Sequence, residues 1–195
     1  MFDRLREHVA GRIPLTDNEF LLCTSQLVPK RIRKDNFLFQ EGEVARYLTF
    51  VTKGCLRSYS VDAKGEEHIV QFAPEGWWIA DMYSFLTGAK ATLFVDALEE
   101  SDVLLLDEKT YEQLCTTIPK FERYFRVLLQ NHYVASQRRL LASISLSAEE
   151  QYLQLMADYP TIVQRVAQRH LASYLGITPE ALSRIRNRIA KHPKS

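Results

Sequence analysis

Between residues 28 and 107 the chain carries a succession of short β-prone runs, and their spacing constrains the fold more than any other feature of the sequence. Aromatic and β-branched residues fill the runs, and turn signals that contain glycine separate them, at Gly42, Gly54, Gly65 and Gly76. Many short strands at such intervals are typical of a sandwich or barrel and not of a parallel sheet. We therefore expect an antiparallel barrel in this segment.

A long helical run follows the barrel segment, from Pro119 to about Ser143. Alternating steps of four and three residues place six side chains on one stripe of this helix: Phe121, Phe125, Leu128, His132, Ala135 and Arg139. Such spacing is typical of a coiled coil and favours a seam between two copies of the chain. The alternative is a helix that packs against its own barrel.

Two capping boxes mark helix starts outside the barrel segment. Thr16 with Glu19 opens a helix that extends to about residue 27, and Ser147 with Glu150 opens another. The link between the long helix and this last one contains neither glycine nor proline, and it is the predicted hinge.

Residues 168–191 are typical of two short helices joined by a tight turn. Gly176 suits the left-handed conformation that ends a helix, Thr178 can cap the next helix, and Pro179 fits its first turn. At about 100° per residue the second helix has an apolar face and a polar, basic face. The apolar face holds Ala181, Leu182, Ile185 and Ile189, and the other holds Glu180, Ser183, Arg184, Asn187 and Lys191. A major groove admits such a helix; the alternative is a helix pair whose charges only face water.

Charge is divided unevenly along the chain. The formal net charge is only +1, but residues 161–195 hold seven basic residues and one acidic residue. This stretch therefore carries +6 and leaves −5 for residues 1–160. A basic terminal module on an acidic body favours a polyanionic partner at one end of the chain.

Cysteine use and hydropathy indicate a cytoplasmic protein with no membrane partner. Cys23, Cys55 and Cys115 are far apart and lack the CxxC spacing of a metal or redox site, so we expect reduced thiols. The first residues are charged and lack the apolar run of a signal peptide. No stretch of the sequence has the apolar length that spans a bilayer.

Three stretches in fixed order carry a family resemblance. Residues 39–54 are similar to the opening strands of a cyclic-nucleotide-binding barrel, residues 64–67 to the hairpin turn that follows, and residues 172–185 to a recognition unit. In this order the chain resembles the Crp/Fnr family, which includes the cyclic-AMP receptor protein and the fumarate–nitrate regulator, over nearly its whole length. The resemblance implies an α+β fold with an N-terminal double-stranded β-helix (a jelly-roll barrel), a long dimerisation helix and a C-terminal helix-turn-helix.

The resemblance also implies a domain division and a set of partners. We expect a barrel domain with N-terminal helices over 1–118, the dimerisation helix and hinge over 119–146, and the helix-turn-helix domain over 147–195. The implied assembly is a homodimer whose two recognition helices enter successive major grooves of double-stranded DNA about one helical turn apart. RNA polymerase is a further partner implied by the family.

Expected DNA contacts fall into two kinds. By position, Glu180, Arg184 and Asn187 stand where the family reads base edges, whereas Arg169, Arg186, Arg188 and Lys191 are better placed for phosphates. The full set of expected contacts is Arg169, Thr178, Pro179, Glu180, Ser183, Arg184, Asn187, Arg188 and Lys191. Many relatives carry a β-hairpin wing after the recognition helix; none is expected here, so some phosphate contacts should be missing.

The cassette that binds the cyclic phosphate departs from the family pattern. Ile79-Ala80-Asp81 stands in place of its Gly-Glu pair, and Ala91-Thr92 in place of its Arg-Ser pair. Because alanine replaces the arginine that pairs with the phosphate, we expect an effector other than cyclic AMP, or none. The expected ligand residues are Ile79, Ala80, Asp81, Lys90, Ala91 and Thr92, with Ser136 and Gln137 on the long helix by alignment with the purine contacts.

Two rival classes make different predictions. An oxygenase on a similar barrel needs two histidines and a carboxylate, and His68 is the only histidine between Val28 and Asp107, so we expect no enzyme, no metal and no cofactor. A ligand-sensing barrel that acts through protein partners would carry a helix-turn-helix that no longer docks on DNA. Steep loss of DNA binding with salt would favour the regulator over this second rival.

Overall fold

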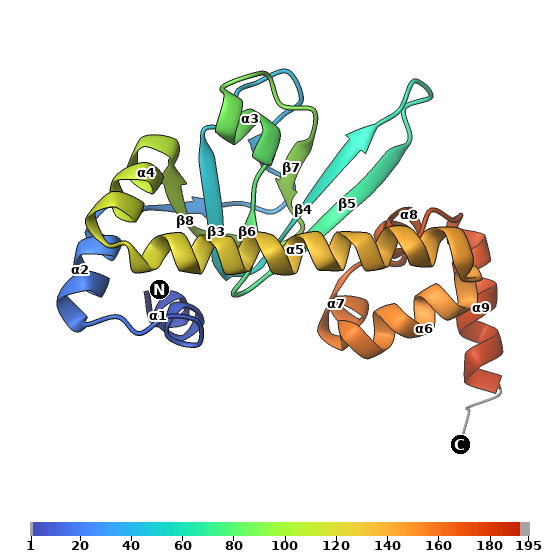
Figure 1. Cartoon of the computed structure of the whole chain (residues 1–195). Coiled ribbons are helices and arrows are strands. Elements are labelled where there is room, and N and C mark those ends of the chain that lie inside the picture. The colour runs from blue at the N-terminus through green and yellow to red at the C-terminus, as the bar shows by residue number, and fades with distance from the viewer. Residues whose placement is uncertain (1, 192–195) are drawn as a thin grey trace. The chain divides into compact units, whose positions relative to one another are not determined.

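The computed structural model describes residues 2–191. Contacts divide the chain into two compact units: the first holds Met1–Ser60 and Gln71–Asn131, and the second holds Val61–Val70 and His132–Ser195 (Figure 1). The second unit therefore combines the tip of a β-hairpin with the C-terminal part of the chain. The expected three-part division at residues 118 and 146 stays a prediction, and the last four residues, where no wing is expected, lie outside the described residues.

Two four-stranded sheets form the barrel of the first unit, as the sequence predicts. In spatial order, one sheet consists of β1 (Val28–Ile32), β8 (Ser101–Asp107), β3 (Tyr47–Lys53) and β6 (Trp78–Ile79). The other consists of β2 (Phe37–Phe39), β7 (Phe94–Ala97), β4 (Cys55–Val61) and β5 (Glu67–Pro74). Strand β8 pairs antiparallel with β1 and β3, and β7 pairs antiparallel with β2 and β4. The fold is α+β.

Apolar side chains fill two cores in this unit. Alternation along β3 sends Val51 into the barrel, where it joins Leu56, Val95 and Val103. The same alternation sends Phe50 to the outer face of its sheet, where helices cover it. These helices are α1 (Phe2–Ala10), α2 (Asp17–Ser25), α4 (Glu108–Thr117) and the first turns of α5 (Lys120–Ser145).

The predicted capping boxes are confirmed at both helix starts. The Thr16 side chain accepts a hydrogen bond from the backbone N–H of Glu19 at 3.2 Å, and the Glu19 carboxylate accepts one from the backbone N–H of Thr16 at 2.8 Å. Ser147 and Glu150 make the same reciprocal pair at the start of α6 (Ala148–Asp158). Local sequence alone determines these starts, because both partners lie within one turn.

The predicted seam on the long helix is wrong for its first half. Phe121 and Phe125 are 1% and 4% exposed and belong to the outer core of the first unit, and Leu128 packs against that core. The alternative, a helix that packs on its own barrel, therefore describes these three residues. The opposite face of α5 instead carries exposed apolar side chains, chiefly Tyr133, Leu140, Leu141 and Ile144, each more than 60% exposed.

A buried ion pair crosses the sheet that contains β4 and β7. Arg57 and Asp96 are direct cross-strand partners, and the Arg57 guanidinium donates two hydrogen bonds to the Asp96 carboxylate, at 2.8 and 2.9 Å. The same guanidinium lies 4.3 Å from the ring centre of Tyr59, which stacks on Phe94. Alternation places this group on the face opposite Leu56, outside the inner core.

The structure contains two short helices that the sequence did not predict. Helix α3 (Met82–Thr87) begins after Asp81, whose side chain accepts a hydrogen bond from the Ser84 backbone N–H, and it ends at Gly88 in the left-handed conformation. Helix α7 (Pro160–Arg165) begins at the proline that closes the preceding helix pattern. Among residues 2–191 none of the helices combines the length and the apolar composition needed to cross a membrane.

Candidate nucleic-acid interface

The predicted helix-turn-helix is present in the second unit. Helix α8 (Gln168–Tyr174) leads through Gly176, at φ 67°, to α9 (Pro179–Lys191). The Thr178 hydroxyl accepts a hydrogen bond from the Ala181 backbone N–H at 3.2 Å, which confirms the predicted cap. Leu182 and Ile185 of α9 are buried, as are Leu171 and Ala172 of α8, so the two helices share one apolar contact.

The polar face of α9 is exposed along its length. Glu180, Ser183, Arg184, Asn187 and Lys191 all face solvent. The side chains of Glu180, Arg184 and Asn187 make no hydrogen bond or ion pair with any other described residue. Because none of the described groups occupies these side chains, they can bind an external ligand without breaking a contact among residues 2–191.

Other predicted DNA residues have partners inside the unit. The Arg188 guanidinium lies 2.8 Å from the Glu149 carboxylate of α6, an exposed pair that the sequence analysis missed. Arg169 donates to the ring nitrogen of His170 at 3.3 Å, and the carbonyl of Pro179 accepts from the Gln168 amide at 3.1 Å. Arg169 and Arg188 stay exposed to solvent. Because exposed pairs are weak, these contacts can give way to a phosphate at little cost in free energy.

The cassette predicted to hold a ligand is closed by its own side chains. One oxygen of Asp81 accepts from the Ser84 backbone N–H at 3.0 Å. The other accepts from the backbone N–H and the hydroxyl of Thr92, at 2.8 and 3.1 Å. Asp81 is 3% exposed. Through these bonds its carboxylate caps the helix that follows and connects the two ends of the cassette.

The remaining predicted ligand residues are distributed over core and surface. Ile79 and Ala91 belong to the inner core at 1% and 3% exposure, while Ala80 is partly buried against the outer core and Lys90 is exposed. Ser136 and Gln137 are exposed on the part of α5 that belongs to the second unit. The structure brings Asp81 and Thr92 together; a joint ligand role for the eight residues stays a prediction.

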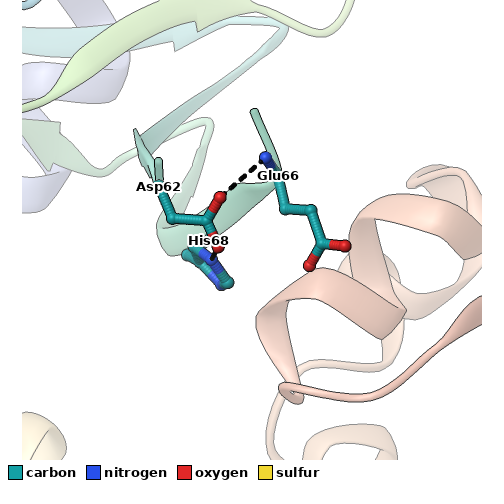
Figure 2. A group of neighbouring side chains, drawn as sticks. All are labelled: Asp62, Glu66 and His68. Carbon is teal, nitrogen blue, oxygen red and sulfur yellow. Dashed lines mark hydrogen bonds and ion pairs between the residues drawn. The ribbon is translucent and has the colours of Figure 1, made fainter. Parts of the chain in front are cut away.

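One group of potential metal ligands comes together in the described part of the chain, at the tip of the β4–β5 hairpin. The ligand atoms of Asp62, Glu66 and His68 lie within 4.8 Å of one another, and all three residues are exposed (Figure 2). Asp62 accepts from the backbone N–H groups of Lys64 and Glu66, at 2.8 and 3.0 Å, and lies 2.9 Å from the His68 ring nitrogen. These bonds, first that to His68, hold the pKa of Asp62 below its usual range. They are the contacts of a turn and account for the cluster.

The fold is that of a class of proteins in which a jelly-roll barrel is followed by a long helix and a helix-turn-helix. The cyclic nucleotide-binding domain family matches residues 29–117. The fumarate and nitrate reduction regulatory protein of Vibrio cholerae is 28% identical over an alignment 198 positions long, which spans 92% of this chain and 76% of that protein. The regulatory protein HlyX of Actinobacillus pleuropneumoniae is 27% identical over 178 residues, 83% of this chain and 71% of that protein.

Solved structures agree on the fold. FixK2 from Bradyrhizobium japonicum superposes with a TM-score of 0.73 at 20% identity and covers 86% of each chain. The c-di-GMP responsive global regulator CLP of Xanthomonas campestris superposes with a TM-score of 0.74 at 14% identity, over 90% of this chain and 92% of that one. The chain is therefore similar to transcriptional regulators of the Crp/Fnr type over most of its length, and residues 29–117 match their cyclic nucleotide-binding domain.

Proposed function

We propose that this chain regulates transcription as a homodimer that binds double-stranded DNA through the polar face of α9. The observation that carries the proposal is the exposed row of Glu180, Arg184 and Asn187, whose side chains have no partner among the described residues. A helix with such a face, supported from behind by a second helix, fits a major groove. In this role the chain binds and does not catalyse, acts in the cytoplasm, and has RNA polymerase as a further partner.

The exposed apolar face of α5 supports the homodimer. Tyr133, Leu140 and Ile144 are 62%, 61% and 75% exposed, and their spacing fits two-stranded helix packing when Gln137 fills the intervening position. Leu141, at 63%, widens the same face. Large apolar side chains gathered on one helix face mark an interaction surface. A second copy offers the identical stripe, so the contact is self-complementary.

Within the interface, position on α9 divides the work. Arg184 lies at the centre of the exposed face and reads guanine through two hydrogen bonds, while Glu180 accepts from cytosine. Lys191 lies at the end of α9, and it contacts phosphates together with Arg169 and Arg188. Base contacts supply sequence choice, whereas phosphate contacts supply affinity that depends on salt.

Arg184→Ala should therefore lose sequence preference, and Lys191→Ala should lose affinity for all DNA. The ratio of affinities for cognate and scrambled duplexes should fall about 10- to 100-fold for Arg184→Ala, because a bidentate base contact discriminates by ~1–3 kcal/mol. For Lys191→Ala the ratio of affinities should stay unchanged. The slope of log affinity against log salt should become shallower by about one, the contribution of one phosphate contact.

Fluorescence titrations with duplexes selected from a random pool by the wild-type protein measure both quantities. Arg126 is exposed on α5 and lies in the other unit, so Arg126→Ala is the control and should change neither quantity. Equal losses on both duplexes for Arg184→Ala would contradict the assignment of this residue to base reading. Retention of DNA that does not depend on salt would contradict the proposed function itself.

We further propose that cyclic AMP is not the effector. Ala91 stands where a phosphate-pairing arginine would be needed, and both Asp81 oxygens already accept hydrogen bonds from Ser84 and Thr92. A bound nucleotide would meet a carboxylate that these bonds already engage, and it would find no arginine at residue 91 to pair with its phosphate. Millimolar cyclic AMP should leave the thermal unfolding midpoint unchanged, since only a ligand that binds the native state raises it; a reproducible rise would contradict the proposal.

A further inference from the structure

Strand β5 lies at the edge of its sheet, and its edge backbone groups have an unusual partner. The Ser173 hydroxyl of α8 donates a hydrogen bond to the carbonyl of Glu67 at 2.5 Å and accepts one from the backbone N–H of Ile69 at 3.1 Å. Backbone groups on a strand edge normally need another strand or water. Here one side chain from the helix-turn-helix satisfies two of them, although 106 residues separate Ser173 from Glu67.

Arg139 of α5 binds the same stretch of strand from another element. Its guanidinium donates to the carbonyls of Ile69, at 3.2 Å, and of Val70. The guanidinium also lies 4.3 Å from the ring centre of Tyr174, the neighbour of Ser173. The planar fork of arginine allows both kinds of contact at once. Residues 67–70, Arg139 and residues 173–174 therefore form one cluster, which we call the hairpin latch.

The hairpin that enters the latch has a fixed tip. Asp62 accepts from the backbone N–H groups of Lys64 and Glu66 and pairs with His68; Figure 2 shows its contacts with Glu66 and His68. This Asx-type turn limits the conformations of the strand that leads into Glu67. The latch therefore holds α8 against a braced hairpin.

The latch supports the interface without covering it. Its contacts involve α8, whose Leu171 and Ala172 form the apolar contact with α9. The polar face of α9 stays exposed, with Arg184 and Asn187 facing solvent. A contact that inhibited DNA binding would be expected to cover those side chains. The latch leaves them exposed, so its contacts are better suited to orienting the helix-turn-helix.

We propose that Ser173 and Arg139 are positioning residues of the DNA interface: they fix the helix-turn-helix on the β4–β5 hairpin and so set the orientation in which α9 meets a groove. The inference rests on the proposed DNA binding. Two recognition helices must reach successive grooves about one helical turn apart, so a fixed orientation translates into a preferred spacing of half-sites. Without the latch each helix-turn-helix could adapt to several half-site spacings. Its conformational entropy would then fall on binding, which lowers the affinity.

The first arm of the test uses the protein without DNA. Hydrogen exchange at the Ile69 amide should accelerate about two- to tenfold in Ser173→Ala, because the amide loses its acceptor. Arg139→Lys, which keeps the charge but loses the planar fork, should accelerate exchange in the hairpin too. Arg138→Lys, one residue away and exposed, is the matched control and should change nothing. An unaltered Ile69 rate in Ser173→Ala would overturn the latch.

The second arm measures spacing preference on DNA. Palindromic duplexes are selected from a random pool by the wild-type protein, and each is compared with a copy that has one base pair inserted between the half-sites. The wild type should prefer the original about tenfold or more, an amount equal to ~1.4 kcal/mol. Ser173→Ala and Arg139→Lys should bring that ratio close to one, a change that lower stability alone would not produce.

The outcomes separate the two proposals. A wild type that retains no duplex overturns the proposed function and this inference with it. A wild type that binds with a spacing preference, together with variants that keep the same preference, overturns only the inference.

Discussion

Aspartate at both Leu140 and Ile144 is expected to convert a dimer into monomers and to lower affinity for a palindromic duplex on the order of a hundredfold, because the second half-site no longer adds its contacts. Both side chains are more than 60% exposed on the α5 face proposed to meet a second copy. Charges placed opposite their own symmetry mates must be desolvated and repel each other. Sedimentation velocity gives the mass, and duplex titration gives the affinity.

Leu21→Asp is the control for this experiment. Leu21 is 68% exposed, as much as the two interface residues, but it lies on α2 in the other unit. The control should remain dimeric and keep its affinity for DNA. A double aspartate variant that stays dimeric would show that α5 meets its partner through a different face, or not at all.

Asp96→Ala should lower the free energy of unfolding by about 3–5 kcal/mol, the usual cost of leaving one member of a buried ion pair alone. The side chains of Arg57 and Asp96 are only 8% and 10% exposed, and the carboxylate accepts two hydrogen bonds from the guanidinium. Removing Asp96 takes away the carboxylate that balances the buried Arg57 charge. Urea unfolding followed by circular dichroism measures the loss.

Two further variants serve as controls for Asp96→Ala. Glu100→Ala breaks the pair with Arg31, whose side chains are 58% and 63% exposed, and should cost less than about 1 kcal/mol. Replacing the buried pair together, as Arg57→Met with Asp96→Leu, should recover much of the loss because no charge is then left unpaired. Similar losses for Asp96→Ala and Glu100→Ala would contradict the burial assigned to the first pair.

Local features of the sequence predicted their structures well. The capping boxes at Thr16 and Ser147, the glycine at 176 and the cap at Thr178 each depend on partners within one turn, so the sequence contains the whole interaction. The barrel followed from repeated short strands, although β6, with two residues, was too short to carry a pattern. The helical spacing of the apolar residues in α9 predicted which face packs on α8, and therefore which polar face stays exposed.

The long helix shows what periodicity leaves open. A stripe that includes Phe121 and Phe125 predicts burial correctly, but it does not say which surface buries it. In this chain the surface is the protein's own outer core. Leu140, Leu141 and Ile144 on the opposite face could have indicated a partner. Their exposure becomes clear only once the stripe of Phe121 and Phe125 is known to pack on the barrel.

Asp81 and Ser173 show a second limit. Both residues act through atoms far along the chain: Asp81 clamps Thr92, 11 residues away, and Ser173 bonds a strand 106 residues earlier. No local pattern encodes such contacts. Asp81 is also a helix cap, a role that the sequence could have indicated through the short helix that follows it.

In the proposed complex, two copies of this chain present their α9 helices to one duplex. The most direct measurement is the mass of the complex formed with a selected palindromic duplex, taken by sedimentation equilibrium over a series of salt concentrations. We expect two chains per duplex and an affinity that falls steeply as salt rises. One chain per duplex, or no complex at low salt, would contradict it.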